Sequence, residues 1–526
     1  MGKEKTNANL GFEKQIWDAA CVLWGHIPAA EYRKVIIGLI FLRYISCVFE
    51  KKYKQLLEEG DGFEDDRDAY AEDNVFFVPK EARWDVIAKA AHTPEIGSVL
   101  DGAMRSIEQE NPVLKNVLPK NYGNPDLDKR VLGEVVDLFT NEVHMDDTEE
   151  SKDLLGRTYE YCIAQFAEVE GTSGCEYYTP ASIVKIIVSV LKPFEDCRVY
   201  DPCCGSGGMF VQSEKFLEAH GGRRGHLAVY GQEANADTWK MAKINMAIRG
   251  IDADFGLYHA DTFSHDLHPN LKADFIMANP PFNLKGWWND NLKNDSRWTD
   301  YATPPESNAN YAWILHMLSH LKPLSGVAGF LLANGALGDT DALEIRKKLI
   351  ENDKVEAIII LPRELFITTD ISVTFWILNQ SKKGGKYHGR QLRNREHEIL
   401  FMDLRQWTDN PVKGEQKKKV QLITEQIQRV ADIYHQWQSE GIDGNNFAVP
   451  ELYRSVGIDE IEANNWTLVP SKYIEFIDHD LEIDYPKEMA RIQREMKELM
   501  QREKESQKML EEAFKGIGYS INKEKV

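Results

Sequence analysis

The spacing of apolar residues divides the chain into three regions. In the first, residues 1 to about 150, apolar side chains recur three or four positions apart, as at Ile36, Ile40 and Tyr44, which predicts a helical domain. Its longest apolar run, Val35 to Leu42, is flanked by basic residues and is much shorter than the roughly 18 residues of a membrane span. We therefore expect a buried helix there.

From residue 151 to about 400, short apolar runs alternate with amphipathic stretches. This alternation predicts an α/β fold, with a largely parallel sheet covered by helices on both faces. The expected strands are residues 198–200, 227–230, 256–259, 274–278, 327–332, 355–361 and 373–378. The expected helices are residues 181–191, 236–249, 310–321 and 342–351. Thr179 before Pro180 predicts an N-cap followed by a proline in the first helical position.

The third region, residues 401–526, is expected to be helical. Met489, Ile492, Met496 and Leu499 repeat at three and four positions between charged residues, which predicts an amphipathic helix with a seam like that of a coiled coil. The seam ends near Glu503, so a long autonomous coiled coil is not expected. A partner helix and the chain's own body are equally compatible with such a face.

Candidate chemistry begins at Asn279-Pro280-Pro281-Phe282, which ends an apolar run. The Asn279 amide oxygen and the Pro280 carbonyl are two acceptors for one planar amino group, and Phe282 is free to stack on the base that carries it. Proline fixes φ and removes competing N–H donors. Alone, such a tetrapeptide is more often a strand-ending turn than a binding site.

An upstream loop changes this balance. Asp201-Pro202-Cys203-Cys204-Gly205-Ser206-Gly207-Gly208 lies between an expected strand and an expected helix. Glycines allow the backbone to approach a ligand closely, and a helix N-terminus presents free N–H groups. The spacing is not that of the dinucleotide fingerprint, so the loop alone is weak evidence.

The next two strand tips carry acidic residues. Glu233 follows the second strand, where a carboxylate can accept hydrogen bonds from both ribose hydroxyls of a nucleoside. Asp261 follows the third and is expected to receive an adenine amino group, with Phe263 against the ring. Each acidic residue alone is as readily a helix cap or a solvated side chain. Four successive tips with such groups favour one site.

Together these motifs resemble the modification subunits of type I restriction-modification systems, a family of adenine-N6 DNA methyltransferases. The resemblance extends from about residue 11 to 475. Further matching segments are Cys21 to His26, Glu31-Tyr32, Leu39 to Tyr44, Glu176 to Pro180, Leu331 to Gly335 and Leu361 to Phe366. Cys203 departs from the family, which more often has a small residue such as alanine there.

The resemblance implies a Rossmann-like methyltransferase sheet over residues 151–400, an all-helical domain over 1–150 and a helical tail over 401–526 that docks a partner subunit. It implies S-adenosyl-L-methionine as cofactor, held by the residues of the glycine-rich loop, Glu233, Asp261 and Phe263. Tyr178, Thr179 and Pro180 are expected to close over its methionine end. Asn279, Pro280, Pro281 and Phe282 then act on a flipped adenine in double-stranded DNA.

The charge balance indicates how DNA is recognised. With 63 basic and 84 acidic residues, the formal net charge is −21, and such a surface repels nucleic acid on average. Basic stretches at Lys382 to Arg395 and Lys417 to Lys419 are exceptions. We infer that another subunit reads the DNA sequence. The resemblance likewise implies a DNA-specificity subunit, a second copy of this chain and a restriction endonuclease subunit as partners.

Composition bounds the remaining classes. The 526 residues suggest two to four domains with a large core. Seven cysteines without a CxxC pair support neither a disulfide framework nor a structural metal. The polar N-terminus lacks the apolar segment of a signal peptide, so a cytoplasmic protein without membrane attachment is expected.

Two other functions use similar residues. An enzyme that methylates a glutamine amide in a protein, or an amino group of an RNA base, also needs an amide-gripping clamp. The helical N-terminal region and the long insert at residues 283–305 disfavour this reading. A scaffold that binds the cofactor without transferring methyl groups is a second alternative, disfavoured because every expected catalytic position is intact.

Overall fold

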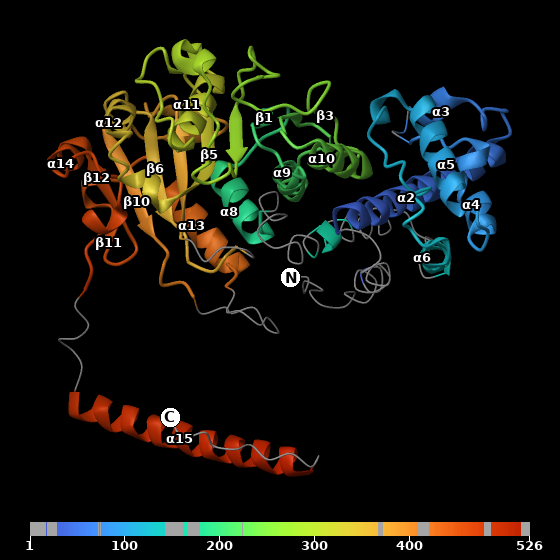
Figure 1. Cartoon of the computed structure of the whole chain (residues 1–526). Coiled ribbons are helices and arrows are strands. Elements are labelled where there is room, and N and C mark those ends of the chain that lie inside the picture. Colours follow the sequence, from blue (N-terminus) through green and yellow to red (C-terminus); the bar gives the residue numbers. More distant parts are fainter. Residues whose placement is uncertain are drawn as a thin grey trace. The chain divides into compact units, whose positions relative to one another are not determined.

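One ten-stranded sheet organises the middle of the chain (Figure 1). The computed structural model describes residues 29–71, 75–141, 179–223, 225–366, 372–408, 420–477 and 485–516, with residues 17, 73, 159, 161–163 and 165. By internal contacts the chain forms two units, residues 1–474 and 475–526. The sheet belongs to the first.

The order of the strands places a switch point in the sheet. The order is β11-β12-β10-β6-β7-β5-β4-β1-β2-β3. The strands are β1 (Arg198–Asp201), β2 (Ala228–Gly231), β3 (Ala253–Asp254), β4 (Phe275–Ala278), β5 (Val327–Ala333), β6 (Val355–Ile360), β7 (Val373–Asn379), β10 (Glu398–Asp403), β11 (Ala448–Val449) and β12 (Tyr453–Gly457). β1 pairs in parallel with β2 on one side and with β4 on the other. Ligands of open α/β sheets bind where strand order reverses in this way, at the carboxyl ends.

Alternation along the strands builds a core on each face. On β4, Phe275 and Met277 join the core that contains α8 (Ala181–Leu191), α9 (Gly208–Ala219), α10 (Ala236–Arg249) and α13 (Thr424–Trp437). Ile276 and Ala278 join the opposite core, with α11 (Asn310–His320) and α12 (Leu343–Glu351). Because both faces are covered, the strand is apolar throughout. The predicted α/β fold is confirmed.

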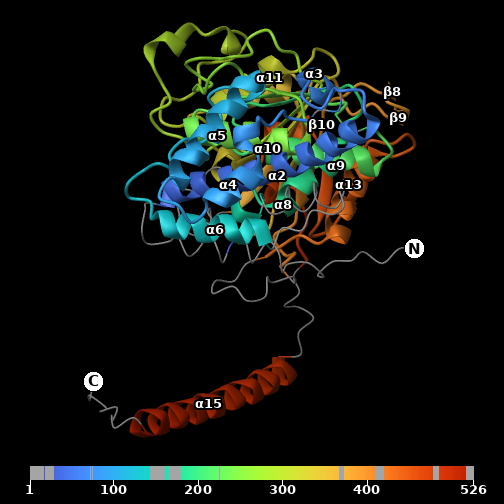
Figure 2. The same ribbon diagram turned by 90° about the vertical axis from the view of Figure 1, so that its right-hand side faces the viewer.

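The N-terminal region is helical, as predicted. Its helices are α2 (Ala29–Glu59), α3 (Arg67–Ala71), α4 (Trp84–Ala90), α5 (Ile96–Glu110) and α6 (Lys129–Asn141), and α2, α4, α5 and α6 pack on one another (Figure 2). Val35 and Leu42, the ends of the long apolar run, are both fully buried in α2. The run lies in a core helix because α2 packs against α4, α6 and α10.

The third strand differs from its prediction. We expected residues 256–259, whereas β3 is Ala253–Asp254. Gly256 has a φ of 70°, which ends the extended conformation, and Leu257 is 92% exposed. The apolar letters after Gly256 therefore belong to a surface loop that leads to Asp261.

The helical region expected from residue 401 also begins elsewhere. β10 pairs with β6, and β12 pairs with β10, so strands as far as Gly457 complete the sheet, whereas the segment between them contains the helix α13, as expected. α14 (Ile458–Ala463) follows. β10 is almost wholly buried, and such a short apolar run has no periodicity that separates a strand from a helix.

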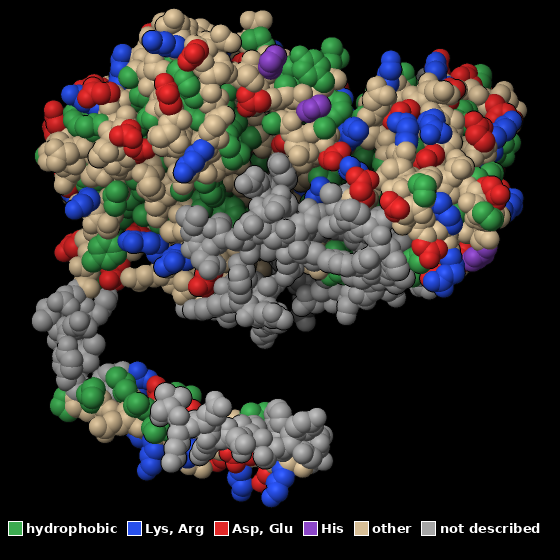
Figure 3. Space-filling model, in the orientation of Figure 1, with side chains coloured by type: hydrophobic (Ala, Val, Ile, Leu, Met, Phe, Trp, Pro, Cys, Tyr) green, Lys and Arg blue, Asp and Glu red, His purple; other side chains and the backbone are tan. Residues whose placement is uncertain are grey.

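The second unit contains α15 (Tyr485–Gly516). It includes the predicted seam, and Met489, Ile492, Met496 and Leu499 are all exposed within the unit. Green apolar side chains are visible along this helix in Figure 3. The prediction of an amphipathic C-terminal helix is confirmed.

Candidate active site

The glycine-rich loop connects the end of β1 to the start of α9. Gly205 and Gly207 have φ values of 55° and 82°, in the left-handed region that favours glycine. A Cβ on Gly207 would lie 2.8 Å from Cε of Met246, the end of a flexible side chain, so the φ of 82° and not lack of space favours glycine there. Gly208 begins α9 and lines a pocket together with Gly205 and Ser206. The loop thus presents backbone and a helix N-terminus to the pocket.

Asp201, the last residue of β1, lies at the base of this pocket. Its side chain is 2% exposed, and its Oδ1 accepts a hydrogen bond from the Cys203 N–H at 3.0 Å. Burial raises the pKa of Asp201 to about 7, against the opposing effect of the hydrogen bond from Cys203. The pocket therefore contains a carboxyl group that titrates near neutral pH.

Glu233 lies just beyond β2 and holds the same loop. Its carboxylate accepts hydrogen bonds from the N–H groups of Gly205 at 3.1 Å and Asn235 at 2.8 Å. The residue is 5% exposed, and burial raises the pKa of its carboxyl group. A carboxylate oxygen can accept more than one hydrogen bond, so these contacts are compatible with the predicted hydrogen bonds to a ribose.

The turn at residues 261–264 is placed beside Glu233 by a hydrogen bond from the Ala260 N–H to the Glu233 carbonyl, at 2.9 Å. Oδ2 of Asp261 accepts hydrogen bonds from the backbone N–H and the hydroxyl of Ser264. Phe263 is 2% exposed and packs against Trp287 and Trp313 in the core. This placement corrects our expectation for Phe263: the ring packs the core beneath the turn and presents no open face for stacking.

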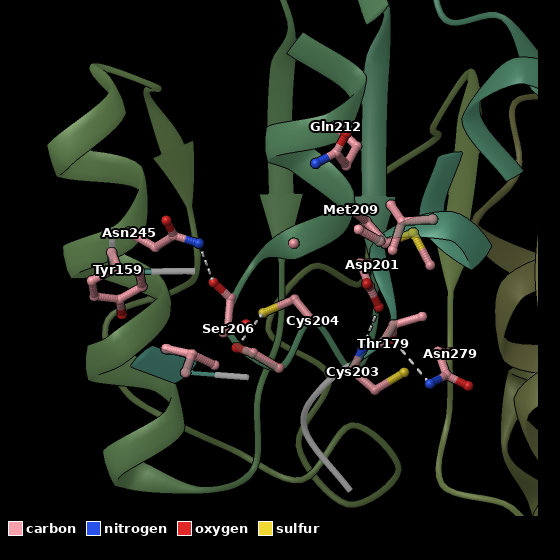
Figure 4. A pocket seen from close by; sticks show the side chains of 15 residues that line it. Tyr159, Thr179, Asp201, Cys203, Cys204, Ser206, Met209, Gln212, Asn245 and Asn279 are labelled. Carbon is pink, nitrogen blue, oxygen red and sulfur yellow. Dashed lines mark hydrogen bonds between the residues drawn. The ribbon is translucent and has the colours of Figure 1, made fainter. Parts of the chain in front are cut away.

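Asn279 follows β4, and the pairing of β4 with β1 brings it to the glycine-rich loop. It lines the same pocket as Asp201, Cys203 and Gly205 (Figure 4). Its Nδ2 donates to the Thr179 hydroxyl at 3.0 Å. Its Oδ1 is buried and accepts no hydrogen bond from any residue that the structure describes. Asn279 therefore contributes a buried acceptor without a partner among the described residues at the wall of the pocket.

Thr179 differs from its predicted role as an N-cap. α8 begins at Ala181, and its capping residue Pro180 makes no side-chain hydrogen bond to the helix. The Thr179 hydroxyl accepts from Asn279 instead, so a long-range partner has replaced the local one. Tyr178, the third residue expected in this segment, lies outside the described residues.

The rest of the tetrapeptide forms the turn beside the pocket. Pro280 is buried, whereas Pro281 and Phe282 are half-buried. The Phe282 ring lies edge-on to Phe366, with centroids 6.0 Å apart and an interplanar angle of 86°. The edge contact leaves part of the Phe282 ring uncovered.

Two family models match the chain: one for N-6 DNA methylases over residues 150–481, and one for the HsdM N-terminal domain over residues 12–139. The type I restriction enzyme HindI methylase subunit of Haemophilus influenzae is 37% identical, over 84% of this chain and 100% of its own length. The MjaIX methylase subunit of Methanocaldococcus jannaschii is 32% identical, over 97% of this chain and 92% of its own. The chain belongs to the N-6 DNA methylases, among the type I restriction methylase subunits.

The fold of this methylase is also found in a solved structure. A type I restriction-modification methyltransferase subunit from Streptococcus thermophilus aligns with a TM-score of 0.71, over 88% of this chain and 99% of that one. At 21% identity this likeness concerns the fold alone.

Asn245 is a site residue of the methylase that the sequence analysis missed. Its Nδ2 donates to the Ser206 carbonyl at 2.8 Å, and its Oδ1 accepts from Nε of Arg249 at 3.2 Å. Asn245 therefore ties α10 to the glycine-rich loop (Figure 4). A signal was present, because Asn245 is a polar residue between the apolar positions Ile244 and Met246 of an expected helix.

Tyr159, Met209 and Gln212 also line the pocket and were not predicted. The Tyr159 hydroxyl donates to the Met241 carbonyl at 2.6 Å, and its ring is fully buried. No local pattern distinguishes these residues from ordinary core and helix positions. They belong to the site only because α9, α10 and the segment around Tyr159 meet there.

The basic stretch at Lys382 to Arg395 is internal at its two ends, whereas Lys383 and Lys386 are exposed. Lys382 pairs with Asp353, and Arg395 with Glu356, and both basic side chains are only 1% exposed. Lys417 to Lys419 lie outside the described residues. On the face shown in Figure 3, acidic and basic side chains are interspersed. Lys382 and Arg395 thus neutralise buried carboxylates and are not available to phosphates.

Membrane attachment can be tested on the helices that are described. None of them combines the length and the apolar character that crossing a bilayer requires.

Proposed function

We propose that this methylase transfers a methyl group from S-adenosyl-L-methionine to N6 of an adenine flipped out of double-stranded DNA, with Asn279 as the central catalytic residue. One observation carries the proposal. Asn279, whose buried Oδ1 has no partner among the described residues, lines the same pocket as Asp201 and the glycine-rich loop. The residue that is to accept the adenine amino group is therefore next to the loop that is to bind the nucleoside cofactor.

The residues of the pocket fit the cofactor. Gly205 and Gly207 allow a close approach of ligand to backbone, and the N-terminus of α9 faces the same space. Glu233 holds the ribose end, Asp261 the adenine amino group, and Asp201, Ser206 and Gly208 line the pocket, with Thr179 and Pro180 beside it. The role of Tyr178 stays a prediction. When bound, S-adenosyl-L-methionine supplies a sulfonium-activated methyl group.

The clamp prepares the adenine amino group. Its N6 is a weak nucleophile because the lone pair is delocalised into the ring. Oδ1 of Asn279 and the Pro280 carbonyl accept the two N6 hydrogens, which favours a pyramidal nitrogen whose lone pair points into the pocket. Thr179 engages the Asn279 NH2 group, so the amide presents its oxygen to the substrate. A strong general base is not needed before transfer, because the proton leaves after N6 has become positively charged.

Phe282 supports the extruded base. Flipping costs a few kcal/mol, of which stacking on one aromatic ring returns about 1 to 3 kcal/mol. The edge contact with Phe366 holds the Phe282 ring in position and leaves its uncovered face for the purine. Pro281 fixes the turn between the clamp and this ring.

Partner subunits supply the DNA contacts that this chain lacks. The net charge of −21 disfavours DNA binding by the chain alone, and the relatives are named as subunits of type I restriction enzymes. We propose that a DNA-specificity subunit, a second copy of this chain and a restriction endonuclease subunit complete the complex. The exposed seam of α15 is the proposed docking element for a partner helix. A cytoplasmic location stays a prediction.

The alternative substrates are disfavoured by the family. Residues 150–481 match DNA methylases, and the HsdM N-terminal domain accompanies them. The cofactor-binding scaffold is disfavoured by the unused acceptor of Asn279, since a site that only binds cofactor has no need of it.

Asn279→Ala tests the proposal. In the complex purified with its partner, we expect N6-methyladenine formation to fall by at least about a hundredfold, the usual effect of removing a transition-state hydrogen bond. Assembly and cofactor binding should be kept. Asn445→Ala, on an exposed turn far along the chain, is the matched control. Methylation by Asn279→Ala at the wild-type rate would contradict the clamp.

A further inference from the structure

Arg297 lies in the insert that follows the clamp and uses all five of its N–H groups. It forms a two-pronged pair with Asp295, at 2.8 and 2.7 Å. It also donates to the carbonyls of Thr262 at 2.9 Å and Phe263 at 2.6 Å, and to Nδ1 of His316 at 3.1 Å. Its side chain is 8% exposed. Two of its bonds thus hold the backbone of the turn that begins with Asp261.

The same turn is fixed from its other side to the glycine-rich loop. The Thr262 hydroxyl donates to the Pro202 carbonyl at 2.6 Å, and Thr262 is 3% exposed. Since Arg297 holds the Thr262 carbonyl, a continuous chain of bonds joins the insert, the turn and the loop. A second route passes from Arg297 through His316 to the hydroxyl of Tyr200, just before Asp201.

The start of the insert, directly after the clamp, is fastened to the first residue of α11. Asn310, 2% exposed, accepts from the Asn283 N–H at 3.0 Å and donates to the Asn283 Oδ1 at 2.8 Å. Asn283 follows Phe282 directly and has a φ of 52°, a conformation that needs such support. Trp298, beside Arg297, is buried and packs against Trp287. The insert is therefore anchored at Asn283, beside the clamp, and at Arg297, beside the turn.

We propose that Arg297, in the insert after the clamp, is a positioning residue: it fixes the position of the turn whose Asp261 binds the adenosine part of the cofactor. The inference rests on the proposed function, because it takes Asp261 as a cofactor ligand. Arg297 itself touches no cofactor. It fixes the position of the 261–264 turn relative to the glycine-rich loop. The affinity for the cofactor therefore depends on a residue of the insert that follows the adenine clamp. By reciprocity, cofactor binding stiffens that insert.

A metal ion is not the organising element of this cluster. Asp266, His316 and His320 bring possible ligand atoms within 4.8 Å of one another. Arg297 donates to Nδ1 of His316, which therefore carries its proton on Nε2, toward the Tyr200 hydroxyl. Neither nitrogen of His316 then has a lone pair for a metal, and the guanidinium charge opposes a cation beside it.

Arg297→Lys tests the proposal, because lysine keeps the charge but cannot hold both carbonyls and Asp295 at once. In the full-length chain, titration calorimetry should show the Kd of S-adenosylmethionine raised about tenfold, within the usual range of coupling between sites. In the complex purified with its partner, KM for S-adenosylmethionine should rise by a similar factor while kcat changes less than about twofold.

Arg395→Lys is the matched control. Arg395 is also a buried arginine paired with a buried carboxylate, but it lies at the other end of the sheet. The Arg395→Lys variant should have a lower melting temperature and an unchanged Kd for S-adenosylmethionine. An equal rise in Kd for both variants, or a Kd for folded Arg297→Lys within twofold of the wild type, would overturn the proposal.

Thr262→Val provides a second route should Arg297→Lys not fold. Removal of the bond to Pro202 loosens the same turn, and we expect a Kd raised about threefold, as for one hydrogen bond. An unchanged Kd would refute the link between turn and loop. Failure of the wild-type chain itself to bind S-adenosylmethionine would instead contradict the proposed function.

Discussion

The two ends of the sheet carry buried polar groups of opposite character. At the carboxyl ends of β1 and β4, Asn279 keeps an acceptor without a partner, and Asp201 has a pKa of about 7. At the opposite, amino-terminal ends of the strands, Glu356 near the start of β6 has a hydrogen-bond donor for each of its two carboxylate oxygens. Buried groups are normally satisfied, and Asn279 differs from the other unpartnered groups of the described residues near Glu356, such as Trp376 and His435, because it lines the pocket beside the glycine-rich loop.

Glu356 shows what a structural network looks like. It is fully buried and accepts hydrogen bonds from Asn379 at 2.6 Å, Tyr434 at 3.0 Å, Arg395 at 3.1 Å and Gln438 at 3.2 Å. Burial alone would raise the pKa of Glu356, but the Arg395 charge and the hydrogen bonds outweigh it and hold the pKa below its usual value. Such a network holds β6, β7 and α13 together and has no vacancy for a substrate.

The largest expected difference between the pocket and the Glu356 network is in the free energy of unfolding. Glu356→Ala leaves Arg395 buried without its partner, and we expect the free energy of unfolding to fall by about 3 to 5 kcal/mol. Denaturant unfolding followed by circular dichroism measures this. The cofactor Kd of the folded fraction should stay as in the wild type. A raised Kd without lost stability would contradict the division between the ends.

A pH titration sharpens the contrast at the catalytic end. Burial raises the pKa of Asp201 to about 7, so the folded protein without ligand favours the protonated carboxyl below that pH. This contribution to stability is full at low pH and is lost as pH rises through 7. A positively charged cofactor favours the carboxylate instead. Its affinity should therefore fall up to about tenfold for each pH unit below 7.

Calorimetry between pH 5.5 and 8.5 follows this change in affinity. Asp201→Asn is the control: its binding should be weaker and nearly independent of pH over the same interval. A wild-type affinity that is constant across neutral pH would show that Asp201 does not sense the charge of the cofactor.

The smallest expected effect concerns the orientation of the clamp. Thr179→Val removes the acceptor for the Asn279 NH2 group and permits the amide to rotate. We expect kcat to fall about fivefold, in keeping with the loss of one hydrogen bond, while melting temperature and cofactor Kd change little. Ser in place of Thr179 keeps the hydroxyl and should restore kcat. Equal loss in both variants would indicate packing and not orientation.

Much of the fold could be predicted because its signals are local. α8 and α10 have the predicted bounds, and β1, β2 and β4 lie within one residue of their predictions. β3 was misplaced, and β10, β11 and β12 were missed, because a short apolar run has the same appearance in a strand, a loop or a helix. The pairing of β10 with β6 depends on partners that are distant in the sequence.

The sequence by itself determined the order of strand tips and the residues they carry, because apolar periodicity, glycine and the Asn-Pro-Pro-Phe turn act over a few neighbouring residues. Only the tertiary structure decided which of these groups have partners. Thr179 contacts Asn279, Phe263 is buried in the core, and Arg395 neutralises Glu356, as the hydrogen bonds and packing show. Each of these roles depends on what lies across the sheet, and that is settled by packing between segments far apart in the chain.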